Sequence, residues 1–238
     1  MISVSKNPGP SAWNDLLPKR EPLPSLSGNL KSDWLIVGAG FAGLSAARRV
    51  QQEAPNDSIV ILDAQGLASG PAGRNSGFMI DLPHDLASDD YGGQIENDRE
   101  AIMQNRYAIN FAKETVEALK LPRECFKEIG KINGAATAKG MRHNHDYAKH
   151  LSKLGEKYEY LDANSMKDIT GTNYYIGGLF TPGTVMIQPA LYIRALGDKI
   201  LSNRVRLYER SPVEELNKVG SDWQAKTPKG VITSSKVI

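Results

Sequence analysis

The chain has 238 residues, 40% of them hydrophobic, which is enough for one large domain or two small ones with a buried core. Its 29 basic and 27 acidic residues leave a formal charge of +2, which excludes a broad electrostatic surface for nucleic acid or an anionic membrane. The single Cys125 excludes an internal disulfide framework, and no apolar run reaches the roughly 20 residues that span a bilayer. We therefore expect a cytoplasmic protein with no nucleic-acid partner and no membrane span.

The first half of the chain begins with an arm and continues into alternating elements. Residues 1–32 are rich in Pro, Ser and Lys, and we expect them to form an arm that docks on the folded body. An apolar strand is predicted at residues 34–37, and apolar spacing predicts a helix at residues 41–53. Residues 59–62 are a continuous aliphatic run, typical of a strand buried on both faces of a parallel sheet. Together they predict a βαβ unit.

The next segments mix one long loop with helices. Residues 65–85 are too rich in Gly, Ala and Ser for regular structure, and loops of this length tend to carry function. Apolar spacing predicts helices at residues 98–119 and 141–154, and a further helix begins at Pro189. Residues 205–238 break into short strands between turn signals, which predicts an antiparallel meander.

Three glycines separate the first strand from its helix. Gly38 permits a tight turn, Gly40 lets the backbone approach a pyrophosphate, and Gly43 lets the helix pack close to the sheet. The helix amino terminus offers unpaired N–H groups to phosphates. Asp63 ends the second strand, where a carboxylate accepts hydrogen bonds from ribose hydroxyls. This pattern predicts a dinucleotide site and leaves the choice between NAD and FAD open.

The loop that follows favours FAD. Its stretch "SGPAGRNSG" combines small residues with Arg74, whose guanidinium can hold phosphate oxygens. With "DWLIVGAGFAGLSAARRV" and "VILDA", it makes the chain resemble the FAD-dependent amine and amino-acid oxidoreductases of the D-amino-acid oxidase and glycine oxidase superfamily. The gamma-glutamylputrescine oxidase-like branch is the most similar. The resemblance continues through "GGLFTPGTVMIQPALYIRALGDKI" and "SPVEEL", so it covers nearly the whole chain.

The resemblance implies a noncovalent FAD and a set of residues that bind it. The implied contacts are Gly38, Ala39, Gly40, Phe41, Ala42 and Gly43 at the pyrophosphate, Asp63 and Ala64 at the adenosine ribose, Arg74, Asn75, Ser76 and Gly77 at the inner part of FAD, and the Val213 backbone at adenine. The implied reaction oxidises the C–N bond of an amine or amino acid by hydride transfer to flavin, and the imine is then hydrolysed. No catalytic acid or base can be named.

The expected fold is α/β. It comprises an FAD-binding Rossmann-like βαβ domain with a parallel sheet and an antiparallel meander, plus part of an α+β substrate domain. After the arm at residues 1–32, we expect the FAD-binding domain at 33–90 and 185–238. The helical segment and part of the substrate domain are expected at 91–184.

The carboxyl terminus suggests a missing complement. Members of the resembling family usually continue beyond the position that matches Ile238, and Lys236–Ile238 read as the start of another buried strand. We therefore expect the chain to be one piece of a larger enzyme whose remaining C-terminal polypeptide completes the sheet. A non-catalytic FAD-binding or electron-transfer subunit is the alternative. An NAD-dependent dehydrogenase is disfavoured by the Arg74 loop and the meander.

Other polar residues are given structural interpretations. His143, His145 and His150 have spacings that fit neither a same-face pair nor a zinc motif, so we expect a solvated helix surface and no metal site. His84 follows the flavin loop and could lie near the isoalloxazine ring, although a loop histidine bound to backbone is favoured. Cys125 is expected to be a packing residue.

Overall fold

The computed structural model describes residues 9, 11–84 and 93–238. The chain forms two compact units, one of Met1–Ser76, Ala118–Cys125 and Gln188–Ile238, the other of Gly77–Glu117 and Phe126–Ile187. Parts of the expected arm (1–8 and 10) and of the expected FAD-binding domain (85–90) lie outside the described residues. The domain boundaries expected from the sequence stay a prediction.

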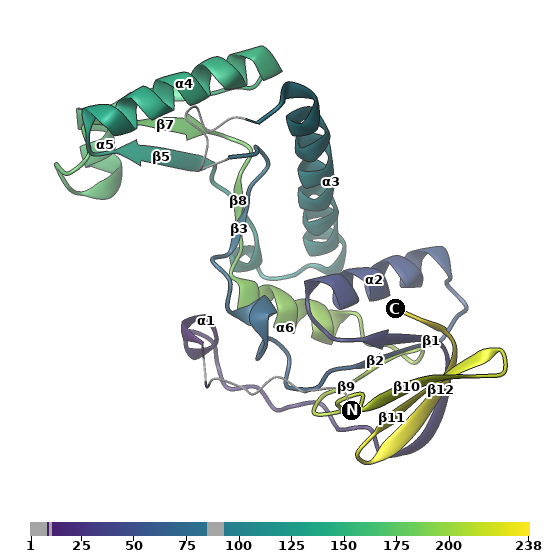
Figure 1. Ribbon diagram of the computed structural model, residues 1–238. Coiled ribbons are helices and arrows are strands. Elements are labelled where there is room, and N and C mark those ends of the chain that lie inside the picture. The colour runs from purple at the N-terminus through teal and green to yellow at the C-terminus, as the bar shows by residue number, and fades with distance from the viewer. Residues whose placement is uncertain (1–8, 10, 85–92) are drawn as a thin grey trace. The chain divides into compact units, whose positions relative to one another are not determined.

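The first unit is built on a six-stranded sheet in the order β10-β11-β12-β1-β2-β9 (Figure 1). Its parallel part consists of β12 (Gly230–Val237), β1 (Gly28–Val37), β2 (Ile59–Leu62) and β9 (Val205–Tyr208). Two antiparallel strands extend it beyond β12, namely β11 (Asp222–Thr227) and β10 (Glu215–Val219). The predicted α/β fold, with a parallel sheet and an antiparallel meander, is confirmed.

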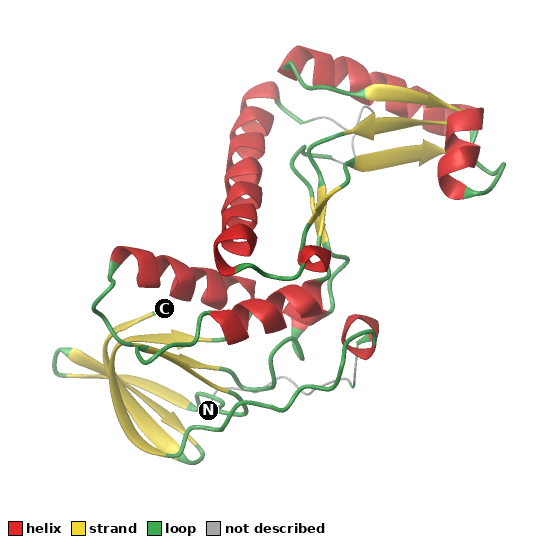
Figure 2. Cartoon of the chain, turned by 180° about the vertical axis from the view of Figure 1, so that it is seen from behind, coloured by secondary structure: helices red, strands yellow, loops and turns green. Residues whose placement is uncertain are grey.

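Both faces of β2 are covered, which explains its unbroken aliphatic sequence. All four of its residues are at most 1% exposed. Val60 packs into a core shared with Ala225 and Ile232 of the meander. On the other side lie α2 (Phe41–Glu53) and α6 (Pro189–Lys199), which Figure 2 shows on one side of the sheet. The predicted helix starts at Phe41 and Pro189 are confirmed.

Three sequence expectations for this sheet are corrected. The first strand begins at Gly28 rather than at residue 34, because residues 28–32 pair with β12 although they are mostly polar. Val205–Tyr208 pairs in parallel with β2 and is not part of the meander. Lys236–Ile238 does not start a new strand, because Val237 ends β12 and Ile238 still exchanges backbone hydrogen bonds with β1.

The second unit combines helices with antiparallel strands. Its helices are α3 (Ile95–Leu119), α4 (Ala138–Leu154) and α5 (Ala163–Thr170), of which α3 and α4 confirm the predicted ones. One sheet has the order β5-β7-β6, with β5 (Lys131–Ala135), β7 (Gly177–Thr181) and β6 (Glu159–Asp162). A smaller one has the order β3-β8-β4, with β3 (Phe78–Met79), β8 (Val185–Met186) and β4 (Lys127–Glu128).

The histidines of α4 do not all lie on a solvated surface. His150 is 5% exposed, and its Nε2 lies 2.6 Å from Oδ2 of the buried Asp98. This carboxylate also accepts the Gly93 amide, so the pair joins α4 to the start of α3. The expectation of a solvated helix face is therefore wrong for His150, because a histidine next to a carboxylate can be buried with its polar atoms satisfied.

The remaining elements are short and belong to the first unit. They are α1 (Ala12–Asp15) and two 3-10 turns, η1 (Pro71–Gly73) and η2 (Arg123–Cys125). The Cys125 thiol is fully buried, and burial raises its pKa to about 12, which confirms a packing residue. Over the described ranges, no helix has both the length and the apolar character that a membrane span requires.

Candidate functional site

The turn between β1 and α2 is closed by contacts within the βαβ unit. Gly38 adopts a φ of +102°, which favours glycine, and its amide donates to the carbonyl of Leu62 at 2.8 Å. A Cβ on Gly43 would lie 1.8 Å from the Gly38 carbonyl oxygen. The start of the helix is therefore packed directly on the turn, and glycine at position 43 is required by the protein itself.

Gly40 differs from the other two glycines. Its φ of −86° and ψ of −167° suit any residue, and among the described residues a Cβ would meet only Ala72 Cβ, at an ordinary 3.6 Å. Neither strain nor packing within this part of the chain demands glycine here. The described protein atoms thus leave room for a methyl group at position 40, where close approach of a ligand to the backbone would need it.

The helix amino terminus supplies hydrogen-bond donors at this space. The first bond within α2 runs from the Leu44 amide to the Gly40 carbonyl at 3.0 Å, and Gly40 has no side chain that could cap the helix. In the described part of the chain, the amides of Phe41, Ala42 and Gly43 have no hydrogen-bond partner. Together with the partial positive charge of the helix end, they form a site suited to an anion.

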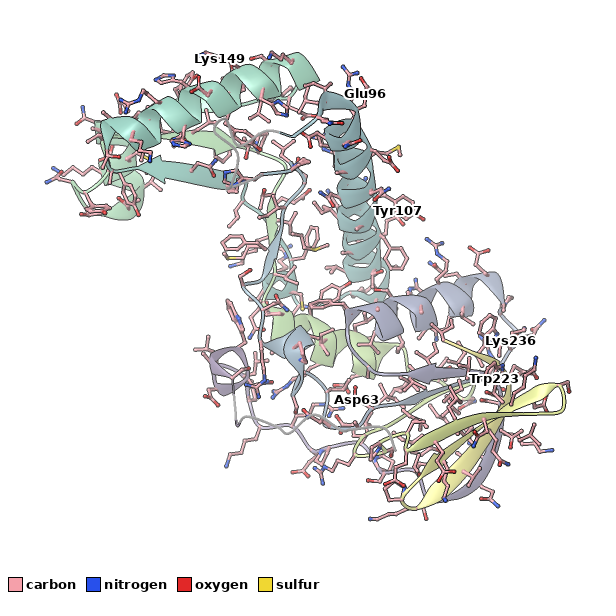
Figure 3. All side chains as sticks on the ribbon, viewed as in Figure 1. Asp63, Glu96, Tyr107, Lys149, Trp223 and Lys236 are labelled. Atoms are coloured by element: carbon pink, nitrogen blue, oxygen red, sulfur yellow. The ribbon has the colours of Figure 1, made fainter. Side chains whose placement is uncertain are left out.

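Asp63 links the end of β2 to the glycine turn. Its Oδ2 accepts the Ala39 amide at 2.7 Å, and its Oδ1 accepts the Gln65 amide at 2.8 Å. Burial raises the pKa of this carboxyl, while the two backbone hydrogen bonds lower it and nearby Glu209 raises it. Each carboxylate oxygen keeps acceptor capacity for a further donor. Asp63 is labelled in Figure 3. The next residue, Ala64, is exposed.

The loop at residues 68–75 approaches the same turn through the Gly40–Ala72 proximity. Arg74 donates through Nε to the Ser69 carbonyl at 2.9 Å and through a terminal nitrogen to the Gly9 carbonyl. Its guanidinium therefore joins the loop to the arm. Contact of Arg74 with a phosphate stays a prediction.

The other loop residues predicted to face a cofactor are placed as follows. Asn75 and Ser76 are exposed, and the Asn75 side chain donates to the Ala72 carbonyl at 2.9 Å. Gly77 begins the second unit, has a φ of +81°, and accepts the Ile187 amide at 2.7 Å.

Val213 lies in the segment that follows β9. This segment runs beside Asp63, whose amide donates to the Tyr208 carbonyl and whose carbonyl accepts the Ser211 amide. The Val213 side chain is 8% exposed and belongs to the core. Among the described residues, its backbone amide and carbonyl have no hydrogen-bond partner, so both groups can pair with a ligand.

Sequence reasoning missed Glu209, the buried acid of this region. Its carboxylate is 0% exposed and accepts the amides of Leu23 and Leu67 at 2.5 and 2.6 Å, together with Arg20 at 2.8 Å. A signal was present, because Glu209 follows β9 just as Asp63 follows β2, and the ends of parallel strands meet at one edge of a sheet.

The sequence of this chain is similar to one protein family and to several curated proteins. The family described as "DAO: FAD dependent oxidoreductase" matches residues 33–238. The chain is 25% identical over 211 residues to "Probable oxidoreductase OrdL" of Haemophilus influenzae, covering 87% of this chain and 48% of that protein. It is 26% identical over 224 residues to "Gamma-glutamylputrescine oxidoreductase" of Escherichia coli, covering 92% and 51%. The chain thus spans about half the length of the curated relatives it matches.

Solved structures share the fold. An L-amino acid deaminase from Proteus myxofaciens superposes with a TM-score of 0.70 at 17% identity, over 91% of this chain and 47% of that one. A glycine oxidase from Geobacillus kaustophilus superposes with a TM-score of 0.67 at 18% identity, over 87% and 54%.

Proposed function

We propose that this chain, which belongs to the family of FAD-dependent oxidoreductases, is the dinucleotide-binding part of an enzyme that oxidises the C–N bond of an amine or amino acid. The observation that carries the proposal is the space before α2, where Gly40 is free to carry a side chain as far as the described protein atoms are concerned. A pyrophosphate in that space explains why position 40 holds glycine and what pairs with the helix amides.

Each part of the site fits one part of FAD. The amides at 41–43 would hold the pyrophosphate, and Asp63, already oriented by two backbone amides, would accept from the adenosine ribose. The unpaired backbone groups of Val213 would pair with adenine, and residues 74–77 would contact the inner part of the cofactor. We propose that these polar contacts hold the cofactor noncovalently.

In this proposal the cofactor supplies the redox chemistry, and the protein residues bind and orient the cofactor. A bound flavin would supply the acceptor for a hydride equivalent from the substrate carbon next to nitrogen, which would leave an imine for water to hydrolyse to a carbonyl compound. This chain's residues bind the nucleotide half and fix its position along the sheet edge. The relative named for gamma-glutamylputrescine supports an amine as substrate. We place the enzyme in the cytoplasm.

A further polypeptide is part of the proposal. The chain spans about half of its relatives, so we infer that the remaining C-terminal polypeptide of the same enzyme completes the catalytic centre. The same fact favours one alternative, a non-catalytic FAD-binding or electron-transfer subunit of a split enzyme. Anaerobic mixing with amines separates the two: an enzyme is bleached once its complement is present, whereas the alternative predicts a yellow protein that no amine bleaches.

FAD titration of two glycine variants tests the cofactor site. Gly40→Ala should weaken FAD binding about tenfold, because the added methyl group stands where the backbone meets the pyrophosphate. Gln224→Ala is the control, since Gln224 is exposed on β11 and belongs to none of the segments assigned to the cofactor. Equal affinities for the two variants, or absence of FAD binding by the wild type, would contradict the proposal. Heating the loaded protein should release all of its flavin.

A further inference from the structure

The amino-terminal arm is hydrogen-bonded to the loop at residues 68–75. Four contacts between them are formed by side chains that reach backbone carbonyls. They are Ser11 Oγ to Gly73 O, Trp13 Nε1 to Asn75 O and Asn14 Nδ2 to Ala68 O, each at 2.8 Å, and Arg74 to Gly9 O. Three arm residues thus hold the beginning, middle and end of one loop.

The arm is fixed in turn to α6, a helix of the same unit. Gln188 caps α6 by accepting the Leu191 amide at 2.7 Å, and its Nε2 donates to the Trp13 carbonyl at 2.8 Å. Farther along, Arg194 donates to the Pro18 carbonyl at 3.1 Å. Helix α6 also packs against both α1 and η1. Trp13 therefore connects two elements: its backbone carbonyl accepts from Gln188 at the start of α6, and its indole N–H donates to the loop.

The loop has little regular structure of its own. Its internal backbone bonds are short-range turns, with the amides of Ser69, Gly73 and Arg74 each donating three residues back. Two glycines, Gly70 and Gly73, increase the entropy that ordering must remove. One of these turns is also fixed by packing, because a Cβ on Gly73 would lie 2.0 Å from the Ala68 carbonyl oxygen. The arm contacts add to this packing at Ala68, Gly73 and Asn75, and so contribute to the order of the loop.

We propose that Trp13 is a positioning residue for cofactor binding, which orders the loop at residues 68–75 before FAD arrives. This inference rests on the proposed function, because the loop carries Arg74 and Asn75. A loop already held in its binding conformation does not lose that conformational entropy on binding, so affinity rises without a direct contact between Trp13 and the ligand. The indole N–H is the group responsible, since it donates to the Asn75 carbonyl at 2.8 Å.

Hydrogen exchange and FAD titration of the 238-residue chain test this role. Trp13→Phe keeps an aromatic ring and removes the N–H donor. We expect the Gly73 and Arg74 amides of the FAD-free variant to exchange about fivefold faster, and FAD to bind about fivefold more weakly. Trp223→Phe is the matched control, because Trp223 lies in β11 and its ring faces Lys218 rather than the loop. Figure 3 labels Trp223.

Two smaller substitutions keep the test decisive if Trp13→Phe fails to fold. Ser11→Ala and Asn14→Ala each remove one loop contact without removing a large apolar group, and each should accelerate the same two amides. Unchanged exchange and affinity in all arm variants would overturn the proposal. Wild-type protein that binds no FAD would instead overturn the proposed function, while the exchange data would still decide whether the arm orders the loop.

Discussion

The turn between β1 and α2 and the loop at residues 68–75 are both glycine-rich and both lie in the first unit, yet they are held in different ways. The turn is closed by its own βαβ unit, through the Gly38 amide and the packing of Gly43 on the Gly38 carbonyl. The loop is held by arm side chains 54 to 62 positions away in the chain, and by the Arg74 side chain bonded to the Gly9 carbonyl of the arm.

This difference indicates which parts of the site tolerate small structural changes and which do not. The turn depends on steric fit between backbone atoms, which admits no small relaxation. The loop has similar packing at Gly73, whose Cβ would lie 2.0 Å from the Ala68 carbonyl oxygen, but its links to the arm are hydrogen bonds worth about 1 kcal/mol each, which water can replace. Changes at Gly38 and Gly43 of the turn should therefore act on folding, whereas changes at Gly40 and in the hydrogen bonds between arm and loop should act on cofactor affinity. Glu209 is the exception, because it anchors the loop's beginning from a fully buried position.

Glu209→Ala should cause the largest loss of stability. Among the described residues, it removes the hydrogen-bond acceptor of the Leu23 and Leu67 amides and leaves the Arg20 guanidinium paired with Asp198. Breaking one side of a buried ion pair costs about 3 to 5 kcal/mol, and we expect about 4 kcal/mol in the urea unfolding free energy.

The control for this prediction is another glutamate of the same unit. Glu215 forms an exposed pair with Lys226, so Glu215→Ala should change the unfolding free energy by less than about 1 kcal/mol. Comparable losses for the two variants would mean that burial of Glu209 does not anchor the loop.

Gly43→Ala should break the turn. Its methyl group would lie 1.8 Å from the Gly38 carbonyl oxygen, a backbone atom that cannot rotate away, so α2 must shift. Overpacking of this kind costs about 3 kcal/mol, measured as a lower urea midpoint. Gly40→Ala, three residues earlier, should change stability by less than about 1 kcal/mol. Equal losses at the two positions would show that the space before α2 is not free.

The same comparison explains what the sequence could predict. The βαβ unit was readable because its signals are local: an apolar strand, helical spacing, three glycines and a terminal acid. The extension of β1 to Gly28 was not, because residues 28–32 are mostly polar and form a strand only through pairing with β12. Tertiary pairing of that kind leaves no local pattern.

Among the candidate site residues, the predictable ones act through their backbone. Gly38 and Gly43 are explained by conformation and packing, which a motif records. The role of Arg74 was predicted from its charge alone, and the structure adds its bonds to Ser69 and Gly9. Contacts between the arm and the loop escape sequence analysis, because side chains that reach distant carbonyls follow no spacing rule.

Comparison with Asp63→Asn should reveal how the Asp63 carboxyl makes the folding stability depend on pH. Burial raises the pKa of the wild-type carboxyl in the folded state, and the bonds from Ala39 and Gln65 oppose this only in part. A raised folded-state pKa contributes stability below the unfolded pKa that is lost as pH rises through the folded one.

The wild type should therefore lose stability relative to Asp63→Asn as pH rises from about 4. Urea unfolding of both proteins at several pH values up to neutrality measures the difference, which should be smaller than either loss above. A difference that grows in the opposite direction would mean that hydrogen bonding to Asp63 outweighs burial. Asp63→Asn also loses one carboxylate acceptor, which lowers its stability by the same amount at every pH and does not change how the difference varies with pH.

Gly70→Ala should produce the smallest effect, and one of opposite sign. Gly70 has a φ of −84°, and nothing among the described atoms lies within 4 Å of its would-be Cβ, so alanine fits without strain. Replacing glycine there lowers the entropy of the unfolded chain and should stabilise the protein by about 0.5 kcal/mol in urea unfolding. A loss of stability would mean that the steric closure at Gly73, where a Cβ would lie 2.0 Å from the Ala68 carbonyl oxygen, extends to position 70. A gain would show that position 70 accepts a side chain while the polar contacts with the arm stay in place.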